Sequence, residues 1–236
     1  MLKSGLAVGL VLTSFTLPAL AGTITLVTDR SALNANDSIN WGQLPGPTLT
    51  IFQTPVAVLS DGGIGATLTT SAGALFKDQQ GNPWLGNFAS GDYLIGTGQL
   101  TQSVPIDVTF ARPVNGVGAQ FGYDVISTSP FPFTESLNVY DAGHNMLASF
   151  SVSGFMDNDA DNSAVFIGVT DTVDEIASAE FFTSTTTGPF PGAFTINEVS
   201  LVEPVPEPGS FALLATALTG FGMTRRKRPL AESNTV

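Results

Sequence analysis

The stretch from Val104 to Phe110 alternates between apolar and polar side chains, and this alternation constrains the fold more than any other feature of the chain. Successive side chains of a β-strand point to opposite faces, so the apolar residues at 104, 106, 108 and 110 share one face. The segment is therefore expected to be a half-buried strand, with one face toward an apolar core and the other toward solvent.

The rest of the central sequence has the same β character. Further segments rich in Thr, Val, Ile and Phe are separated by glycine and proline, as is typical of short strands. They span residues 23–28, 48–53, 56–60, 66–70, 117–123, 164–170, 176–182 and 193–202. No comparable helical period appears between the two ends of the chain, apart from a turn or two at residues 31–36. Many short strands without helices predict an all-β domain, an antiparallel β-sandwich or jelly roll.

The clearest hairpin joins two alternating segments, residues 137–139 and 148–152, through the sequence Asp-Ala-Gly-His-Asn at 141–145. Gly and Asn accept positive φ angles, which tight turns between strands require. Two other stretches, residues 76–92 and 127–133, are expected to form bulky surface loops because they contain proline, glycine and aromatic residues without alternation.

The beginning of the chain has the three parts of a secretory signal peptide. Lys3 supplies a positive charge, residues 5–17 are apolar, and Ala19 and Ala21 form an A-x-A cleavage signature for signal peptidase. We expect cleavage after Ala21, so that residues 1–21 are excluded from the folded domain. A membrane anchor that is not cleaved is the alternative.

The end of the chain has three further features in a fixed order. A proline-bracketed motif consists of Val205, Pro206, Glu207 and Pro208, an apolar run of 14 residues spans 210–223, and a basic cluster consists of Arg225, Arg226, Lys227 and Arg228. At about 1.5 Å per residue a helix over the apolar run spans roughly 21 Å, less than the roughly 30 Å hydrocarbon core of a bilayer. The basic cluster compensates, because long cationic side chains reach the headgroups and hold that end in the cytoplasm. We expect a short membrane helix that leaves everything upstream outside.

This order of motif, apolar run and basic stop resembles the PEP-CTERM sorting signal of exported proteins in Gram-negative bacteria. The resemblance implies that exosortase, a membrane-embedded protease, cuts near the motif and releases or re-anchors the protein. It also implies a transient anchor in the inner membrane, followed by a place on the cell surface, on the outer membrane or in an exopolysaccharide (biofilm) matrix. An ordinary tail anchor with a proline-rich spacer is the alternative.

The segment from Phe110 to Tyr123 is similar to a recurring element of exported PEP-CTERM proteins, in which a Pro-Val turn leads into a G-x-G-A-x-F strand. This similarity covers roughly residues 104–202 and implies a jelly roll of the kind seen in carbohydrate-binding modules. The glycines need no functional explanation, since Gly116 and Gly118 are adequately interpreted as bulge or bend positions.

The chain therefore divides into a signal peptide (1–21), a β-sandwich domain (22–203), a sorting signal (204–228) and a polar tail (229–236). The central segment is long enough for one core and too short for two full domains. The chain contains no cysteine, which excludes a disulfide framework, a thiolate metal site and a cysteine nucleophile.

The charge of the central domain is strongly negative. Of the 8 basic residues in the chain only Arg30, Lys77 and Arg112 lie there, whereas all but two of the 20 acidic residues do. Such a surface repels polyanions and excludes nucleic acid as a partner. It attracts cations, although an acidic surface also serves solubility alone.

The sequence gives little support for an enzyme. Its one histidine, His144, falls in the expected hairpin turn, and no G-x-S-x-G elbow accompanies it. We expect no catalytic site. A glycan hydrolase that uses two carboxylates stays as the alternative, since the acidic residues are numerous and glycosidases need only such a pair.

The candidate metal ligands are Asp157, Asp159 and Asp161, which alternate with amide and small residues in a loop. Carboxylate oxygens at such spacing suit Ca²⁺. The loop departs from an EF-hand, since Asn162 and Gly168 stand at its sixth and twelfth places. A solvated acidic turn is the alternative to a calcium site.

Trp41 and Trp84 are the candidate carbohydrate platform, because aromatic rings in loops can stack on the apolar faces of sugars. Core plugs beneath long loops are the alternative. Taken together, the sequence predicts an exported, exosortase-processed surface or matrix protein whose non-catalytic sandwich binds polysaccharide or Ca²⁺. A purely structural surface or adhesion component is the other possibility that the residues leave open.

Overall fold

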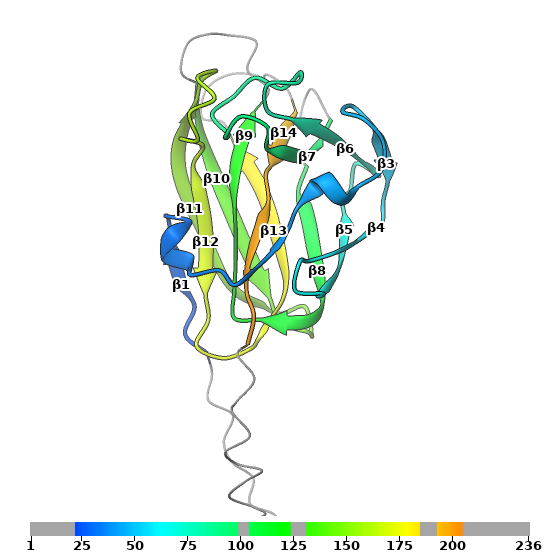
Figure 1. Ribbon diagram of the computed structural model, residues 1–236. Helices are drawn as coiled ribbons and strands as arrows, with labels where there is room; N and C mark the ends of the chain where they lie inside the picture. The colour runs from blue at the N-terminus through cyan, green and yellow to red at the C-terminus, as the bar shows by residue number, and fades with distance from the viewer. Residues whose placement is uncertain (1–21, 99–103, 124–130, 185–192, 205–236) are drawn as a thin grey trace, which may run out of the picture.

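The computed structural model describes residues 22–98, 104–123, 131–184 and 193–204, and in this part the chain forms two antiparallel sheets packed face to face (Figure 1). The expected all-β sandwich is therefore confirmed. The expected signal peptide, sorting motif, apolar run and basic cluster lie outside the described residues. Within the described residues, no helix is long and apolar enough to cross a membrane.

One sheet has nine strands. Its main path runs through β1 (Thr25–Val27), β12 (Phe166–Thr170), β9 (Gly116–Tyr123), β14 (Phe194–Ile196), β7 (Tyr93–Thr97), β6 (Ala74–Gln79) and β3 (Ile51–Gln53). Beside this path, β15 (Val199–Val202) pairs with β9 and with β2 (Asp37–Ile39). Strand β9 is thus flanked by β12 on one side and by β14 and β15, end to end, on the other.

The second sheet has six strands. They are arranged in the order β11 (Met146–Met156), β10 (Phe131–Tyr140), β13 (Ile176–Ser184), β8 (Ile106–Val114), β5 (Gly65–Thr69) and β4 (Val56–Leu59). Two short 3-10 helices, η1 (Ser31–Leu33) and η2 (Trp41–Gln43), connect strands of the first sheet. The expected turn at residues 31–36 corresponds to η1.

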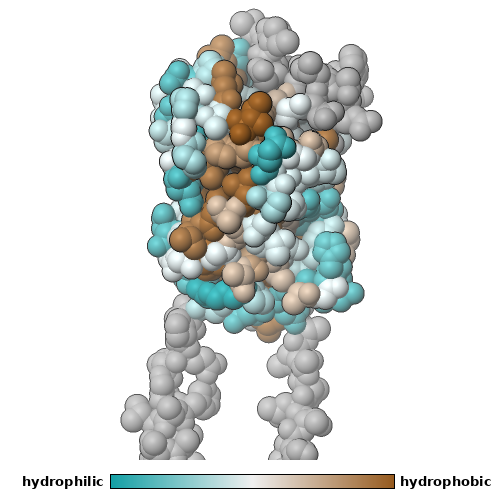
Figure 2. Space-filling view, turned by 90° about the vertical axis from the view of Figure 1, so that its right-hand side faces the viewer, coloured by the Kyte–Doolittle hydropathy of each residue, from teal (hydrophilic) through white to brown (hydrophobic). Residues whose placement is uncertain are grey.

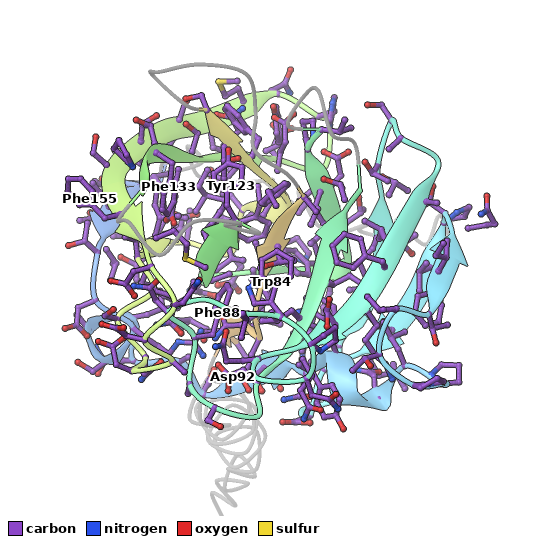
Figure 3. The ribbon with its side chains drawn as sticks, turned by 90° about the horizontal axis from the view of Figure 1, so that it is seen from above. Trp84, Phe88, Asp92, Tyr123, Phe133 and Phe155 are labelled. Carbon is purple, nitrogen blue, oxygen red and sulfur yellow. The ribbon has the colours of Figure 1, made fainter. Side chains whose placement is uncertain are left out.

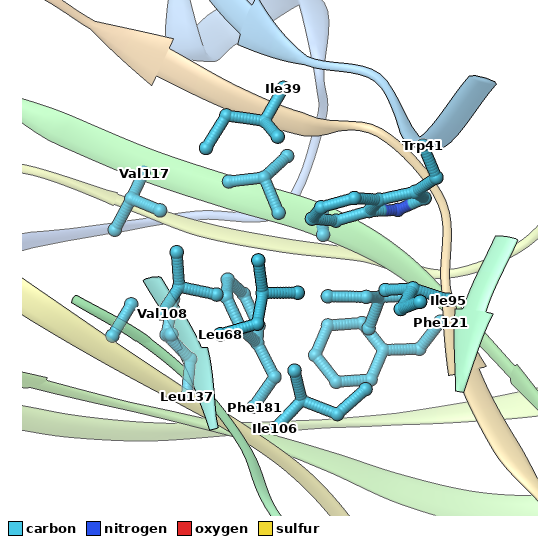
Figure 4. Packing of buried hydrophobic residues seen from close by; sticks show 14 of the residues in the cluster. Ile39, Trp41, Leu68, Ile95, Ile106, Val108, Val117, Phe121, Leu137 and Phe181 are labelled. Atoms are coloured by element: carbon cyan, nitrogen blue, oxygen red, sulfur yellow. The ribbon is translucent and has the colours of Figure 1, made fainter. Parts of the chain in front are cut away.

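The core lies between the sheets and is made by the alternation that the sequence shows. Ile106 and Val108 of β8 are fully buried, whereas Thr109 between Val108 and Phe110 is exposed. Across the core, the rings of Phe121 and Phe181 lie 5.6 Å apart, one from each sheet (Figure 4). Each such large apolar side chain contributes roughly 1.5–3 kcal/mol when it is buried, and the domain has no disulfide to supplement this.

The expected hairpin is confirmed. Strands β10 and β11 pair along their length, and the Asp141 amide and the Asn145 carbonyl close the turn at 3.0 Å. The Asp141 carboxylate accepts hydrogen bonds from the amides of Gly143 and Asn145, and His144 takes the positive φ of 60°. His144 is exposed and stacks on Tyr140, as suits a turn residue.

Other expectations need correction. Residues 76–92 are not simply a surface loop, because β6 occupies the start and Phe88 is fully buried. Gly118 is not a bulge: it pairs regularly with Gly168, and a Cβ on it would lie 2.5 Å from the ring of Phe166. The expected strand at 193–202 is split into β14 and β15 by Asn197 and Glu198.

The chain enters and leaves the sandwich at the same end. Thr25 pairs with Thr170, Thr170 with Gly116, and Gly116 with Val202, so these four residues form one row across the sheet. Figure 1 shows β1 beginning at the lower end, opposite the end at which β6 and β7 are joined.

Candidate functional site

A polar pocket of about 380 Å³ lies beside the middle of β9. Three parts of the chain line it: the segment after β1, the side chain of Gln120 on β9, and the segment that leads into β12. The lining residues are Thr28, Asp29, Arg30, Gln120, Asn162, Ser163, Ala164, Val165 and Phe166. The volume suits a small polar ligand or one or two units of a longer one.

Arg30 forms one wall of this pocket. Its guanidinium lies 5.6 Å from the ring centroid of Phe166 and donates hydrogen bonds to Asn197 Oδ1 (2.6 Å), Glu198 Oε1 (3.2 Å) and Gln120 Oε1 (3.3 Å). Burial lowers the pKa of Arg30, and the nearby carboxylate of Glu198 opposes that shift. These partners fix the position of the side chain.

Gln120 joins the wall to the pocket floor. Its side-chain NH₂ group donates to the carbonyl of Ala164 at 2.9 Å and to Asn162 Oδ1 at 3.2 Å. Its Oε1 accepts a hydrogen bond from Asn197 Nδ2 at 2.8 Å. The backbone N–H of Gln120 in turn donates a hydrogen bond to Asn197 Oδ1. Gln120 is thus a buried polar residue in an otherwise apolar strand, and both ends of its side-chain amide have hydrogen-bond partners, as buried polar groups require.

The rim of the pocket carries the exposed polar residues Asp29, Asn162 and Ser163. The Asp29 carboxylate accepts from the hydroxyl and amide of Ser31, and these hydrogen bonds lower its pKa. Ser163 Oγ accepts from Asn87 Nδ2 at 3.0 Å, which leaves its hydroxyl proton able to donate. Asn162 is held at a positive φ of 65°. The rim therefore presents acceptors and donors side by side, an arrangement suited to the hydroxyl groups of a sugar.

A second concavity, of about 640 Å³, lies on the outer face of β4, β5 and β8. Small or apolar residues line it, including Ala57, Leu59 and Ala111, and Gln43 closes one end through hydrogen bonds to the backbone of Leu59. Figure 2 shows apolar side chains gathered on this side of the molecule. The groove offers area for contact but few groups that fix the orientation of a ligand.

The two tryptophans do not form an exposed platform, and this prediction is corrected. Trp41 is 0% exposed and Trp84 is 4% exposed. Trp41 donates its indole N–H to the carbonyl of Asn197 at 2.8 Å, and Trp84 stacks on Phe76. Figure 3 shows Trp84 beside Phe88 over the interior of the sandwich. Both rings fill space beneath their loops, so the core alternative applies.

The acidic loop does not gather its three carboxylates. Asp157 Oδ1 accepts from the amide of Asp159 at 3.1 Å, and Asp161 Oδ1 accepts from the amide of Ser163 at 3.0 Å. Hydrogen bonds from Ser163 lower the pKa of Asp161. In the part of the chain that the structure describes, no three His, Asp or Glu side chains are grouped to hold a metal ion. The loop instead leads, through Asn162, into the rim of the polar pocket.

The sequence alone did not identify the residues that build the pocket. Arg30 had one usable signal, since it is among the few cations of the domain. Gln120 is the polar residue of an apolar strand, and Asn197 interrupts the last strand segment, but neither pattern indicates a site by itself. Their relation is visible only once β9 and β14 are paired.

Residues 204–228 match the family model described as the PEP-CTERM protein-sorting motif. The chain therefore carries a PEP-CTERM sorting signal, as the sequence indicated, with Val205–Pro208 and Arg225–Arg228 inside the matched residues. This motif implies export, a membrane-anchored sorting signal and processing by exosortase. The comparison with curated proteins gave no match.

Three of the solved structures that resemble this chain are distant likenesses. A DUF4465 family protein from Bacteroides caccae is 9% identical with a TM-score of 0.45, and the match covers 72% of this chain and 100% of that one. TmCBM61, solved with beta-1,4-galactotriose, is 13% identical with a TM-score of 0.34, covering 59% and 88%. The CBM22-1 xylan-binding domain from Paenibacillus barcinonensis Xyn10C is 10% identical with a TM-score of 0.23, covering 68% and 97%. Scores this low support no conclusion about the ligand of this chain.

Proposed function

We propose, from the PEP-CTERM sorting motif at residues 204–228, that this chain is an exosortase-processed protein of the cell surface or extracellular matrix. Its sandwich is a non-catalytic domain that binds polysaccharide. The sorting motif is the observation that carries the export and processing part of the proposal. Strand β15 ends at Val202, two residues before the matched segment, so the motif directly follows the last described strand.

The polar pocket supports the polysaccharide part of this proposal. Its rim places the Asp29 carboxylate, the Asn162 amide and the Ser163 hydroxyl around a cavity of about 380 Å³. Behind the rim, Gln120 donates hydrogen bonds to Asn162 Oδ1 and to the Ala164 carbonyl, and Arg30 in turn donates to Gln120 Oε1. Because the domain is strongly acidic, it repels anionic glycans. The ligand class is therefore a neutral polysaccharide.

The sorting part is tested by the intact mass of the protein recovered from the extracellular matrix of its host. The expected species begins at Gly22 and ends near Pro208. Any excess mass reports an attached glycan or lipid. A species that still includes residues 210–236 indicates a plain tail anchor and overturns the exosortase part.

The binding part is tested with Asn162→Gly. Glycine keeps the positive φ of this position while it removes the amide from the pocket rim. Since one hydrogen bond is worth about 0.5–1.5 kcal/mol, retention on neutral polysaccharide extracted from the matrix should weaken about 3–10-fold. Asn34→Gly is the matched control, because Asn34 is also exposed with a positive φ of 53°. Equal retention of the two variants contradicts a sugar site at this pocket.

A further inference from the structure

Strand β11 forms one edge of the six-stranded sheet and is the longest strand among the described residues. It pairs with β10 on one side, and no described strand pairs with its other side. Figure 1 shows it at the left margin of the sandwich. Because an antiparallel strand directs its backbone groups to alternate sides, about half of the N–H and C=O groups of β11 point away from β10. This edge is therefore open to a further strand.

The edge lacks the residues that usually keep an edge strand from pairing. Proteins commonly place lysine or proline there, or keep the strand short. None of the 11 residues of β11 is charged, and none is proline. Strands β1, β3 and β4, which form the other ends of the two sheets, have only three or four residues each. The one irregularity of register lies at the start of β11, so residues 148–156 pair regularly with β10.

The sequence of β11 is nearly the same when it is read in either direction. The residues equally far from Ser151 are alike in kind: Phe150 and Val152, Ser149 and Ser153, Ala148 and Gly154, Leu147 and Phe155, and Met146 and Met156. Antiparallel pairing of two such strands, centred on Ser151, brings the two members of each pair together, one from each copy. Apolar residues then meet apolar residues and serines meet serines. This is the self-complementarity that a two-fold symmetric interface requires.

The apolar side chains of β11 are incompletely covered. Phe150 and Val152 are partly exposed, although Leu137 and Glu135, which lie opposite them on β10, are 0% exposed. A second copy would place its own Val152 beside Phe150, and its own Phe150 beside Val152, and so remove apolar surface from water. On the outer face Phe155 is 62% exposed, and Figure 3 shows it at the margin of the molecule.

Charge favours a second copy at this edge. The domain is strongly acidic, so two copies repel each other over most of their surface. They can approach most easily where the surface carries no charge, as along β11. We propose that β11 pairs antiparallel with β11 of a second copy, centred on Ser151, so that the two six-stranded sheets become one continuous sheet.

This pairing points the chain ends of the two copies in opposite directions. The turn before β11 lies near Pro113, at the end of the sandwich where the Val202 carbonyl accepts a hydrogen bond from the Asn115 amide. From there β11 extends about 36 Å toward the opposite end.

The distance excludes a dimer of two copies anchored side by side in one membrane. Six residues, 204–209, connect the domain to the apolar run, and at no more than about 3.6 Å per residue they reach about 22 Å. The dimer therefore forms between copies that have been released or that face each other from two membranes. This consequence rests on the proposed sorting, whereas the pairing itself is independent of the sorting and of what the polar pocket binds.

The test uses the absence of cysteine from the chain, so that a disulfide can form only between copies. The full chain with Ser151→Cys is purified in detergent, oxidised and separated without reductant. In the centred register its two thiols lie directly opposite each other, within the range of a disulfide, so a covalent dimer should form.

Ser149→Cys is the matched control, because Ser149 is an exposed serine on the same face. Its two copies would lie four residues apart along the strands, about 13 Å, so the variant should stay monomeric. An equimolar mixture of Ser149→Cys and Ser153→Cys should form a covalent dimer, although neither variant does so alone. The proposal is overturned if Ser151→Cys gives no dimer, or if Ser149→Cys alone gives as much.

A second measurement needs no disulfide. Sedimentation of the parent chain in detergent should show a dimer. Ser149→Glu combined with Ser153→Glu places like charges opposite each other and should raise the Kd of the dimer at least about 10-fold. Ser149→Lys combined with Ser153→Glu places opposite charges there and should restore the dimer. If the two double variants dimerise equally, the contact lies elsewhere in the chain and the proposal is overturned.

Discussion

Glu135 and Asn197 are both buried polar residues of the sandwich, yet their surroundings are opposite. Glu135 is 0% exposed and lies on the core-facing side of β10 with Leu137 and Val139. None of the described residues donates a hydrogen bond to either of its carboxylate oxygens. Burial raises the pKa of Glu135 well above its ordinary value.

Asn197 is 2% exposed, and all of its polar groups are used. Its Oδ1 accepts from Arg30 and from the Gln120 amide, its Nδ2 donates to Asp92 and Gln120, and its carbonyl accepts from Trp41. It also stands at the break between β14 and β15. The comparison teaches that burial alone does not make a polar residue costly. Asn197 belongs to a network in which every polar group has a partner, and this network fixes Arg30 and the pocket. Glu135 has no partner, so its burial lowers the stability of the core.

The largest effect is expected for Asn197→Ala. This change leaves the amide of Gln120 and the carboxylate of Asp92 without a buried partner, and each unpaired group costs about 1–3 kcal/mol. The free energy of unfolding, measured in urea, should fall by about 3–4 kcal/mol. Asn40→Ala is the control: Asn40 is exposed and caps η2 with one hydrogen bond to Gly42, worth about 1 kcal/mol. If the free energy of unfolding fell equally in the two variants, the buried network would contribute no more to stability than a single exposed helix cap.

A smaller effect of opposite sign is expected for Glu135→Met. Methionine has a similar length and no buried acceptor, so the variant should be more stable at pH 7 by roughly 1–3 kcal/mol. Urea denaturation of parent and variant gives this difference. A loss of stability would mean that the Glu135 carboxyl has a favourable role in the core.

The pH dependence isolates the charge of Glu135 from its shape, with Glu135→Gln as the neutral control. In the parent the folded state holds this proton more tightly than the unfolded state, because the folded pKa is raised. The stability that the protonated Glu135 allows is therefore fully present below its ordinary pKa of 4.5 and is lost as the pH rises toward the folded pKa. The Tm of Glu135→Gln should exceed that of the parent by a margin that grows from about pH 4.5 to pH 7. A constant margin contradicts the raised pKa.

Much of the fold followed from local pattern. Period-2 alternation located β8, because a strand buried on one face must alternate whatever it pairs with. The hairpin turn at 141–145 was located correctly, although its positive φ falls on His144 and not on Gly143 or Asn145, and hydrogen bonds to the Asp141 side chain hold it. These features depend on neighbours within a few residues, which the sequence shows directly.

The site did not follow from local pattern, because its parts are far apart in the chain. Gln120 and Asn197 meet only when β9 pairs with β14. The exposure of Trp41 was misjudged for the same reason, since the Asn197 carbonyl that accepts its indole N–H lies between β14 and β15, far away in the sequence. Sequence order does not reveal which strands become neighbours, so polar contacts across them stay hidden.

The smallest effect is expected for Arg112→Gln, because Arg112 forms an exposed ion pair outside the buried network of Asn197. The side chains of Arg112 and Glu203 are 48% and 20% exposed, and an ion pair of this kind is worth less than about 1 kcal/mol. The loss in urea should therefore be well below that of Arg30→Gln, because Arg30 also bonds Asn197 and Gln120 in the buried network. If Arg112→Gln lowered the free energy of unfolding as much as Asn197→Ala does, burial of a polar contact would not explain its contribution to stability.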